Sequence, residues 1–295
     1  MPSIAHQVLA AVIPRLRGSA EVVDADALRR EIVAARPTTA PAPPTRVRGC
    51  DVAPVPGSAF PVYAVTPPGA TPGRTVLYLH GGGYVSGADR LHWRYAARLA
   101  RTLHARVVVP LYPLAPEHTW RDSHEELIAL YERVCATSPA GVVLAGDSAG
   151  GGYALALAQA VVRRDLPRPS HLLLISPWVD LAGTTPGTEQ ARARDTWLRL
   201  SKLRLYGRWW AGDDDPARPE CSPLFGDLAG LPPTLVLCGT RDLLQPQVRA
   251  LADRAGAAGW DLTYIEKPDL IHVYPILPVP EARPAFLVAV AFLHV

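Results

Sequence analysis

The chain has 295 residues, 48% of them apolar, and a formal net charge of +3. These values fit one large α/β domain or two small ones with a sizeable core. The basic residues form no stripe with interleaved aromatic residues, and no run of about 18 apolar residues occurs, which argues against a nucleic-acid-binding surface and a membrane span.

Cysteine spacing and the N-terminal residues bear on redox chemistry and location. The four cysteines form no C-x-x-C pair, which argues against a zinc site or a redox motif; they are Cys50, Cys135, Cys221 and Cys238. The first residues, MPSIAHQVLAAVIPRLRG, lack a positively charged start, and Pro14 breaks their short apolar stretch. We therefore expect no secretory signal and a cytoplasmic location.

Two helical patterns occupy the first 36 residues. The first apolar stripe consists of Ile4, Val8, Leu9 and Val12, and the second of Val22, Leu28, Ile32 and Val33. The proline-rich segment RPTTAPAPPT, residues 36–45, follows as a linker. Two short helices cannot bury such stripes alone, so we expect both to pack on another part of the protein. Residues 1–45 are thus expected to form a unit separate from residues 46–295.

From residue 46 onward, strand patterns alternate with helical patterns. Strands are expected at 46–52, 60–66, 75–80, 106–112, 141–147, 171–177, 233–239 and 262–268, the first two as a hairpin. Helices are expected at about 89–103, 118–136, 149–163 and 244–257, with a last one from about 281. A polar, tryptophan-containing helical insertion at about 180–219 interrupts the alternation. Continuous apolar runs are typical of buried parallel strands, so the pattern predicts a mostly parallel, doubly wound α/β sheet.

Three consecutive glycines follow the apolar strand that ends at His80. Glycines destabilise regular structure by roughly 0.5–1 kcal/mol each relative to alanine. A run of three therefore indicates either a tight turn or a loop whose bare N–H groups can be approached closely. The run alone leaves both interpretations open.

The motif GDSAG, Gly146–Gly150, joins an expected buried strand to an expected helix. It matches G-x-S-x-G, in which a serine on a sharp strand-to-helix turn needs very small residues two positions before and after it. This context favours a nucleophile over an ordinary loop serine, so Ser148 is the predicted nucleophile. A serine hydroxyl needs a general base, and that base needs a group that orients it.

The acid and the base are expected after later strands, in that order along the chain. Asp242 follows the strand that ends near Gly239, and His272 follows the strand that ends near Lys267. Position favours His272, because active sites of such sheets lie beyond the carboxyl ends of strands. The weaker candidates fall on helices or at less suitable positions; they are His92, His104, His118, His124 and His171. Asp269 is the rival acid, but it lies in the loop of the histidine itself.

A serine nucleophile assigns a chemical role to the glycine run. Acyl transfer passes through a tetrahedral intermediate with an oxyanion, and one backbone N–H donor to that oxygen contributes about 10²–10³ in rate. The loop after this strand is where such a donor is expected. We therefore predict that the N–H groups of Gly82, Gly83 and Ala149 form an oxyanion hole, and that His80 orients the loop through a hydrogen bond.

The complete set of motifs resembles one family. HGGGY (80–84), YPLAPEH (112–118), GDSAGG (146–151), SPWVDL (176–181), SPLFGDLAGLPPTLVLCGTRDLL (222–244) and HVYP (272–275) are similar to motifs of the hormone-sensitive-lipase-like esterases, bacterial family IV, of the α/β-hydrolase fold. The likeness spans roughly residues 74–290. It implies Ser148, His272 and Asp242 as nucleophile, base and acid, the oxyanion donors named above, and neither a metal nor a cofactor.

The resemblance also implies a helical cap, built from the N-terminal segment and the 180–219 insertion. The implied substrate is a small-molecule ester of short to medium acyl chain. Six aromatic residues are candidates for the pocket wall or the cap, although core packing is the more common role of each; they are Tyr84, Trp93, Trp178, Trp197, Trp209 and Trp210. Relatives often pair through an edge strand, so a homodimer is compatible with the sequence without being required.

Two motifs depart from the family pattern. Where many members have D-Y-R-L-A-P-E, this chain reads LYPLAPE at 111–117, so a salt bridge common in the family is missing from a loop that we expect to be structural. Where many members have D-P-L-x-D, this chain reads DLLQP at 242–246, which leaves Asp242 without a second acid.

Three other activities fit the same fold. An elimination or cyclisation becomes feasible where water is excluded, and amide or N-acetyl hydrolysis uses the same groups. The plant gibberellin receptors resemble this family but lack the catalytic histidine, so His272 argues against a receptor. A simple nitrophenyl ester separates a hydrolase from a lyase, since the lyase should release little nitrophenol.

Overall fold

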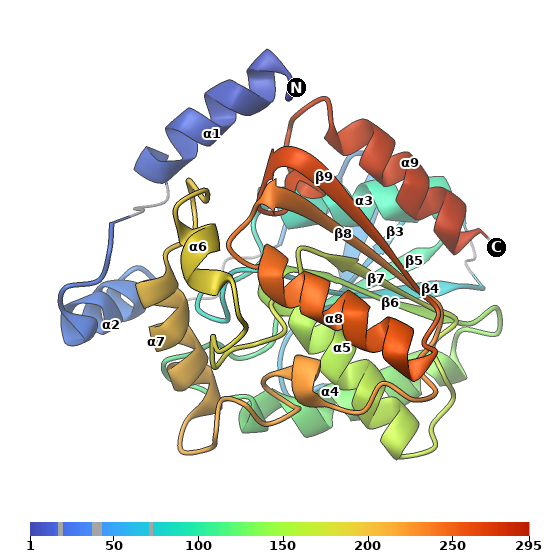
Figure 1. Ribbon diagram of the computed structural model, residues 1–295. Coiled ribbons are helices and arrows are strands. Elements are labelled where there is room, and N and C mark those ends of the chain that lie inside the picture. Colours follow the sequence, from blue (N-terminus) through green and yellow to red (C-terminus); the bar gives the residue numbers. More distant parts are fainter. Residues whose placement is uncertain (17–19, 37–42, 71–72, 295) are drawn as a thin grey trace.

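A mixed sheet of nine strands forms the centre of the protein, for which the computed structural model describes residues 1–16, 20–36, 43–70 and 73–294 (Figure 1). In order across the sheet the strands are β1 (Arg46–Val47), β2 (Cys50–Pro54), β3 (Val62–Thr66), β5 (Arg106–Pro110), β4 (Thr75–Leu79), β6 (Val142–Asp147), β7 (His171–Ile175), β8 (Thr234–Arg241) and β9 (Leu262–Ile271). The pairs from β1 to β5 are antiparallel, and those from β5 through β4 to β9 are parallel. The mostly parallel α/β sheet predicted from the sequence is confirmed.

Helices cover both faces of the sheet (Figure 1). One face carries α3 (Arg90–Leu103) and α9 (Ala282–Leu293), and the other carries α4 (Arg121–Ala136), α5 (Ser148–Arg163) and α8 (Gln245–Ala258). The other described helices are α1 (Ile4–Leu16), α2 (Ala25–Ala34), α6 (Thr188–Arg192) and α7 (Leu200–Ala211), with 3-10 turns η1 (Pro223–Phe225) and η2 (Tyr274–Ile276). Every residue of β4, β6 and β7 is buried, which explains their continuous apolar sequences. None of the described helices has the length and apolar composition to cross a bilayer.

The strand order reverses at β4, which lies between β5 and β6. In open α/β sheets, ligands bind beyond the carboxyl ends of the strands at such a reversal. Leu79 at the end of β4 pairs with Gly146 near the end of β6. The glycine run and the GDSAG motif therefore leave the sheet side by side at the same edge.

Two strands differ from the prediction. Arg48 and Gly49, with φ angles of +46° and +84°, form a tight turn that divides the predicted strand 46–52 into the hairpin β1–β2. Of these two strands only β2 pairs with β3. The pairing is antiparallel, as expected for the predicted hairpin. At the other edge, β9 continues past the predicted end to Ile271, with an irregularity in its pairing opposite Gly239. His272 therefore follows its strand directly.

Helix α1 packs with a different face from the one predicted. The larger side chains of the predicted stripe are exposed at Ile4, Val8 and Val12, whereas the buried face consists of His6, Ala10 and Ile13. Nε2 of His6 accepts a hydrogen bond from the backbone N–H of Ile271 at 3.1 Å. The buried face of α1 thus includes a polar contact that an apolar stripe does not reveal. No residue of α2 is fully buried.

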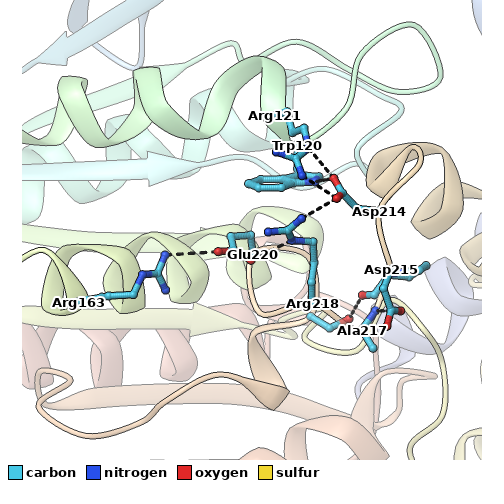
Figure 2. Close-up of polar contacts among 10 residues, drawn as sticks. Trp120, Arg121, Arg163, Asp214, Asp215, Ala217, Arg218 and Glu220 are labelled. Carbon is cyan, nitrogen blue, oxygen red and sulfur yellow. Dashed lines mark hydrogen bonds and ion pairs between the residues drawn. The ribbon is translucent and has the colours of Figure 1, made fainter.

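A cluster of hydrogen bonds and ion pairs links the end of the 180–219 insertion to the start of α4 (Figure 2). Asp214 accepts hydrogen bonds from Nε and Nη2 of Arg121, both at 2.6 Å, and from the indole N–H of Trp120 at 2.9 Å. Arg218 donates to Asp214 at 2.7 Å and to Glu220 at 3.0 Å. The hydrogen bond from Arg121 and the nearby positive charges hold the pKa of Asp214 well below its usual value. Asp214 thus joins the end of the insertion to the start of α4, beside the hydrogen bond from the N–H of Trp120 to the carbonyl of Trp210.

Candidate active site

The turn that carries Ser148 lies between β6 and α5. The φ angle of Ser148 is +51°, a left-handed conformation that non-glycine residues rarely adopt. A Cβ atom on Gly146 would lie 2.3 Å from the carbonyl oxygen of Gly150, and one on Gly150 would lie 2.1 Å from that of Leu79. Only glycine fits at these two positions, which explains the spacing of the motif.

Three side chains from the carboxyl ends of β6, β8 and β9 are joined by hydrogen bonds. Oγ of Ser148 lies 2.9 Å from Nε2 of His272, and Nδ1 of His272 lies 2.9 Å from Oδ2 of Asp242. All three side chains are buried. The structure thus brings together the residues that the sequence predicts as nucleophile, base and acid.

The surroundings of His272 favour its protonated form. Burial lowers the pKa of an imidazole, but the charge of Asp242 and the hydrogen bond to it outweigh burial and raise the pKa of His272. Asp242 also accepts the N–H of Leu244 at 2.9 Å and the S–H of Cys238 at 3.6 Å. A histidine paired in this way with a buried carboxylate is suited to take the proton of a serine hydroxyl.

The rival acid of the sequence analysis lies away from this chain of hydrogen bonds. Asp269 is exposed, and its backbone N–H donates to Oγ1 of Thr240 at 2.8 Å. Within the described ranges, no hydrogen bond or ion pair joins Asp269 to His272.

A second carboxylate, which sequence reasoning missed, lies beside the pair of Asp242 and His272. Asp195, in the insertion, is buried and accepts the N–H of Leu243 at 2.7 Å and that of Trp197 at 2.6 Å. Burial, followed by the charge of Asp242, raises the pKa of Asp195 to about 6. The ring of Trp197 packs edge-on against His272 with the centroids 5.5 Å apart. Asp195 therefore connects the insertion to the residue after Asp242, and it holds the tryptophan that packs against His272.

The glycine run presents unpaired N–H groups beside Ser148. Gly82 and Gly83 have φ angles of +122° and +63°, and both line the cavity that contains Ser148. Among the described residues, their N–H groups have no protein acceptor. Ala149 lies in the first turn of α5, where N–H groups have no acceptor within the helix. Unpaired backbone donors next to a serine hydroxyl are what an oxyanion hole requires.

Asp147, within the nucleophile motif, ties the glycine run to the turn. Its Oδ1 atom accepts the hydroxyl of Tyr78 at 2.5 Å and the N–H of Gly81 at 3.1 Å, and its Oδ2 atom lies 3.5 Å from Nε2 of His92. Burial raises the pKa of a carboxyl, but His92 and these hydrogen bonds outweigh burial and lower the pKa of Asp147. The ionised side chain thus holds the loop at a fixed distance from Ser148.

We predict that Gly81→Ala lowers kcat by about 10²–10³, the effect of losing one oxyanion donor. A Cβ atom on Gly81 would lie 2.3 Å from Oδ2 and 3.0 Å from the carbonyl oxygen of Asp147, so the loop must move away from the turn. The measurement is kcat on a simple ester, with the thermal midpoint as a check on folding. Gly256→Ala, where a Cβ meets nothing within 4 Å, is the matched control. An unchanged kcat for Gly81→Ala would show that the loop does not position the donors.

A cavity of about 350 Å³ opens beside Ser148. Its apolar walls come from the insertion, the glycine loop and the segment after His272; they include Val85, Trp197, Leu198, Leu203, Tyr206, Ile276 and Leu277. The insertion therefore borders the site, as the predicted cap requires. No residue of α1 or α2 lines the cavity.

Most of the aromatic residues predicted for the pocket wall lie elsewhere. Tyr84, Trp93 and Trp178 are buried in the hydrophobic cores, and the partly buried Trp209 packs against Tyr206. Trp210 is also buried, stacked on Tyr84 with the centroids 4.3 Å apart. The assignment of these residues to the pocket wall was wrong, because their large apolar surfaces stabilise the core. Trp209 and Trp210 belong to α7 of the insertion, so their alternative assignment, to the cap, stays a prediction. Trp197 is the one of the six candidates that lines the cavity.

Arg36, the first residue of the proline-rich linker, contacts the LYPLAPE loop. Its guanidinium lies 2.5 Å from Oε2 of Glu117 and also donates to the carbonyl of Ala115. The loop supports the glycine run, because the hydroxyl of Tyr112 donates to the carbonyl of His80 at 2.6 Å. The loop therefore has an ion pair after all, with an arginine from a distant part of the chain.

Comparison with known proteins identifies relatives of this chain. A profile of the alpha/beta hydrolase fold matches residues 76–276. An acetyl-hydrolase of Streptomyces hygroscopicus is 38% identical over 233 residues, which is 77% of each chain. An esterase of Acinetobacter venetianus is 32% identical over 186 residues, 62% of this chain and 61% of that protein. A crystal structure of an esterase from the bacterial hormone-sensitive lipase family superposes with a TM-score of 0.84 at 30% identity, over 99% of this chain and 98% of that one.

Proposed function

Because this chain belongs to the α/β-hydrolase family, among the hormone-sensitive-lipase-like esterases, we propose that it cleaves carboxylic esters of short to medium acyl chain through an acyl-enzyme on Ser148. One observation carries the proposal. A hydrogen-bonded line from Ser148 through His272 to Asp242 opens into the same cavity as the unpaired N–H groups of the glycine run.

The reaction follows from this geometry. Ser148 Oγ attacks the acyl carbon while Nε2 of His272 takes its proton. The N–H groups of Gly82, Gly83 and Ala149 stabilise the oxyanion that forms. His272 then protonates the leaving alcohol, activates water, and so releases the acid from Ser148. Asp242 keeps the proton on Nδ1 of His272 throughout.

The cap is proposed to set the acyl limit. The cavity is about 350 Å³, and Leu203 and Tyr206 of α7 form part of its wall. Such a volume lies at the lower end of the range of pockets for small molecules. The similarity to an acetyl-hydrolase supports acetyl as one acyl group, so acetate esters and N-acetyl amides both belong in the test.

The location, the domain division and the oligomeric state predicted from the sequence form part of this proposal. All four cysteines are unpaired, which supports the predicted cytoplasmic location. Two other features stay predictions. One is the division of the chain into residues 1–45 and 46–295, with the insertion at about 180–219 as part of the cap. The other is a homodimer.

We expect the protein to release nitrophenol from p-nitrophenyl acetate and butyrate, with kcat/KM falling as the acyl chain exceeds the cavity. The measurement is initial rate against acyl length, with an N-acetyl nitroanilide in parallel. A lyase or a receptor would release little nitrophenol from any of the esters. That result would refute the proposed hydrolysis.

A further inference from the structure

A second cavity, of about 490 Å³, lies between α1, α3, the segment 275–280 and the start of α9. We call it the arginine groove, because its wall contains the side chains of Arg48, Arg94, Arg98 and Arg283. Among the residues that the structure describes, no carboxylate lines the groove. As far as the structure describes the chain, none of the four guanidinium groups forms an ion pair with an acid.

The acid nearest to Arg283 in sequence binds a residue outside the groove. Glu281, two residues before Arg283, accepts the N–H of Ser3 at 2.5 Å and its hydroxyl at 3.0 Å. These contacts join the start of α1 to the start of α9, at one border of the groove (Figure 1). The carboxylate of Glu281 therefore binds Ser3 rather than the arginines of the groove.

Three of the four arginines, Arg48, Arg98 and Arg283, are close enough for their charges to interact. The guanidinium carbon of Arg98 lies 3.6 Å from the ring centroid of Phe286, which fixes this half-buried side chain in place. Burial lowers the pKa of Arg98, and the charges of Arg48 and Arg283 lower it further. Like charges at such range repel, and a bound anion relieves the repulsion.

An unpartnered buried hydroxyl lies behind the same wall. Tyr95, on α3 between Arg94 and Arg98, lines the groove, and its hydroxyl has no hydrogen-bond partner in the structure. Buried hydroxyl groups are nearly always paired, so an unpaired one calls for an explanation. The oxygen of this hydroxyl is itself buried, so it lies behind the wall of the groove and out of reach of a ligand there.

We propose that the arginine groove binds an oxyanion group of the carboxylate or phosphate class, and that this group is carried on the ester substrate. Guanidinium forks match the oxygens of both anions with paired, charge-assisted hydrogen bonds. This inference rests on the proposed esterase activity. It adds a substrate class, namely esters with an apolar part and an anionic end.

The walls of the two cavities connect the groove to the active site. Leu91, Ile276 and Leu277 line both the cavity beside Ser148 and the groove. Arg94 follows Leu91 by one helical turn, so it lies on the same side of α3. The carboxylates nearest this path, Asp89 and Asp147, are both in contact with His92. A substrate that passes the shared residues therefore meets the guanidinium groups next.

The test compares two series of p-nitrophenyl esters with acyl chains of four to eight carbons. One series ends in a methyl group and the other in a carboxylate, so that each pair differs only in the terminal charge. We expect kcat/KM to favour the carboxylate by about tenfold or more at one length, the effect of one charge-assisted hydrogen bond. Arg94→Gln combined with Arg283→Gln should abolish this preference and leave the methyl series unchanged.

A matched control removes two positive charges from another part of the surface. Arg133 and Arg164 are exposed and pair with Glu126 and Glu125, away from both cavities. Their double change to glutamine should keep the preference, since exposed pairs contribute little to stability. Loss of the preference in this control would overturn the groove assignment in favour of the net charge of the protein.

Calorimetric titration with inorganic phosphate distinguishes a free anion from a substrate group. Phosphate binding that is lost in the Arg94 and Arg283 variant, together with the ester preference, supports the proposal. Binding without any ester preference would overturn the substrate part and assign the groove to a free anion. Neither binding nor preference, with the methyl series still hydrolysed, would overturn the whole inference while the esterase activity stands.

Discussion

Ser148→Ala should abolish ester hydrolysis, with kcat lower by about 10⁴–10⁶, because the acyl-enzyme can no longer form. The hydroxyl lost is the one that lies 2.9 Å from Nε2 of His272. Folding should be unaffected, since alanine is smaller than serine and meets the same backbone conformation at φ +51°. The measurements are kcat on p-nitrophenyl butyrate and the thermal midpoint of both proteins.

A covalent probe provides the control for this prediction. A fluorophosphonate should label the wild-type protein at Ser148 and leave Ser148→Ala unlabelled. Ser86 also lines the cavity and is the other serine that a probe in the site would meet. Labelling of Ser86 in the wild-type protein, or full activity in Ser148→Ala, would contradict the assignment of the nucleophile.

Asp242→Asn should lower kcat by about 10⁴, because an amide no longer fixes the tautomer in which His272 accepts the proton of Ser148. The lost interaction is the 2.9 Å contact between Oδ2 of Asp242 and Nδ1 of His272. The amide is nearly isosteric with the carboxylate, so the fold should stay intact. The measurement is kcat at saturating ester, with circular dichroism to verify folding.

Asp269→Asn is the matched control. Asp269 is exposed with a φ angle of +62°, a conformation that asparagine adopts readily. Its loss should change kcat by less than about tenfold, since its carboxylate touches neither His272 nor the cavity within the described structure. Reversed losses in the two variants would make Asp269 the partner of His272.

The sheet and the three hydrogen-bonded residues were predictable because their sequence signals are local. Each buried parallel strand is a continuous apolar run, and the chain must turn where that run ends. Ser148 and Asp242 come just after such runs, whereas His272 follows the partly exposed edge strand β9. The order of the strands along the chain was enough to place all three. Local spacing also identified Gly82 and Gly83, which need backbone conformations that other residues rarely adopt.

The cap and the pocket were not predictable, because their contacts join distant parts of the chain. Aromatic size alone does not tell a core residue from a wall residue, so Trp93 and Trp178 were misplaced while Leu203 was missed. The contact of Arg36 with Glu117 spans 81 positions along the chain, and no periodicity encodes it. The buried face of α1 includes His6, whose polar contact an apolar pattern cannot reveal.

The packing around Ser148 divides the chain into parts that directed evolution can and cannot change. A Cβ atom on Gly152 would lie 1.9 Å from the carbonyl oxygen of Trp178, and one on Gly151 would lie 3.0 Å from Cα of Pro177. These obstacles are main-chain atoms, so no change of rotamer relieves the overlap. Libraries that randomise the turn would consist largely of inactive clones, whatever the ester used for screening. Diversity directed at Leu203 and Tyr206 of α7 would instead alter the cavity wall and leave the nucleophile in place.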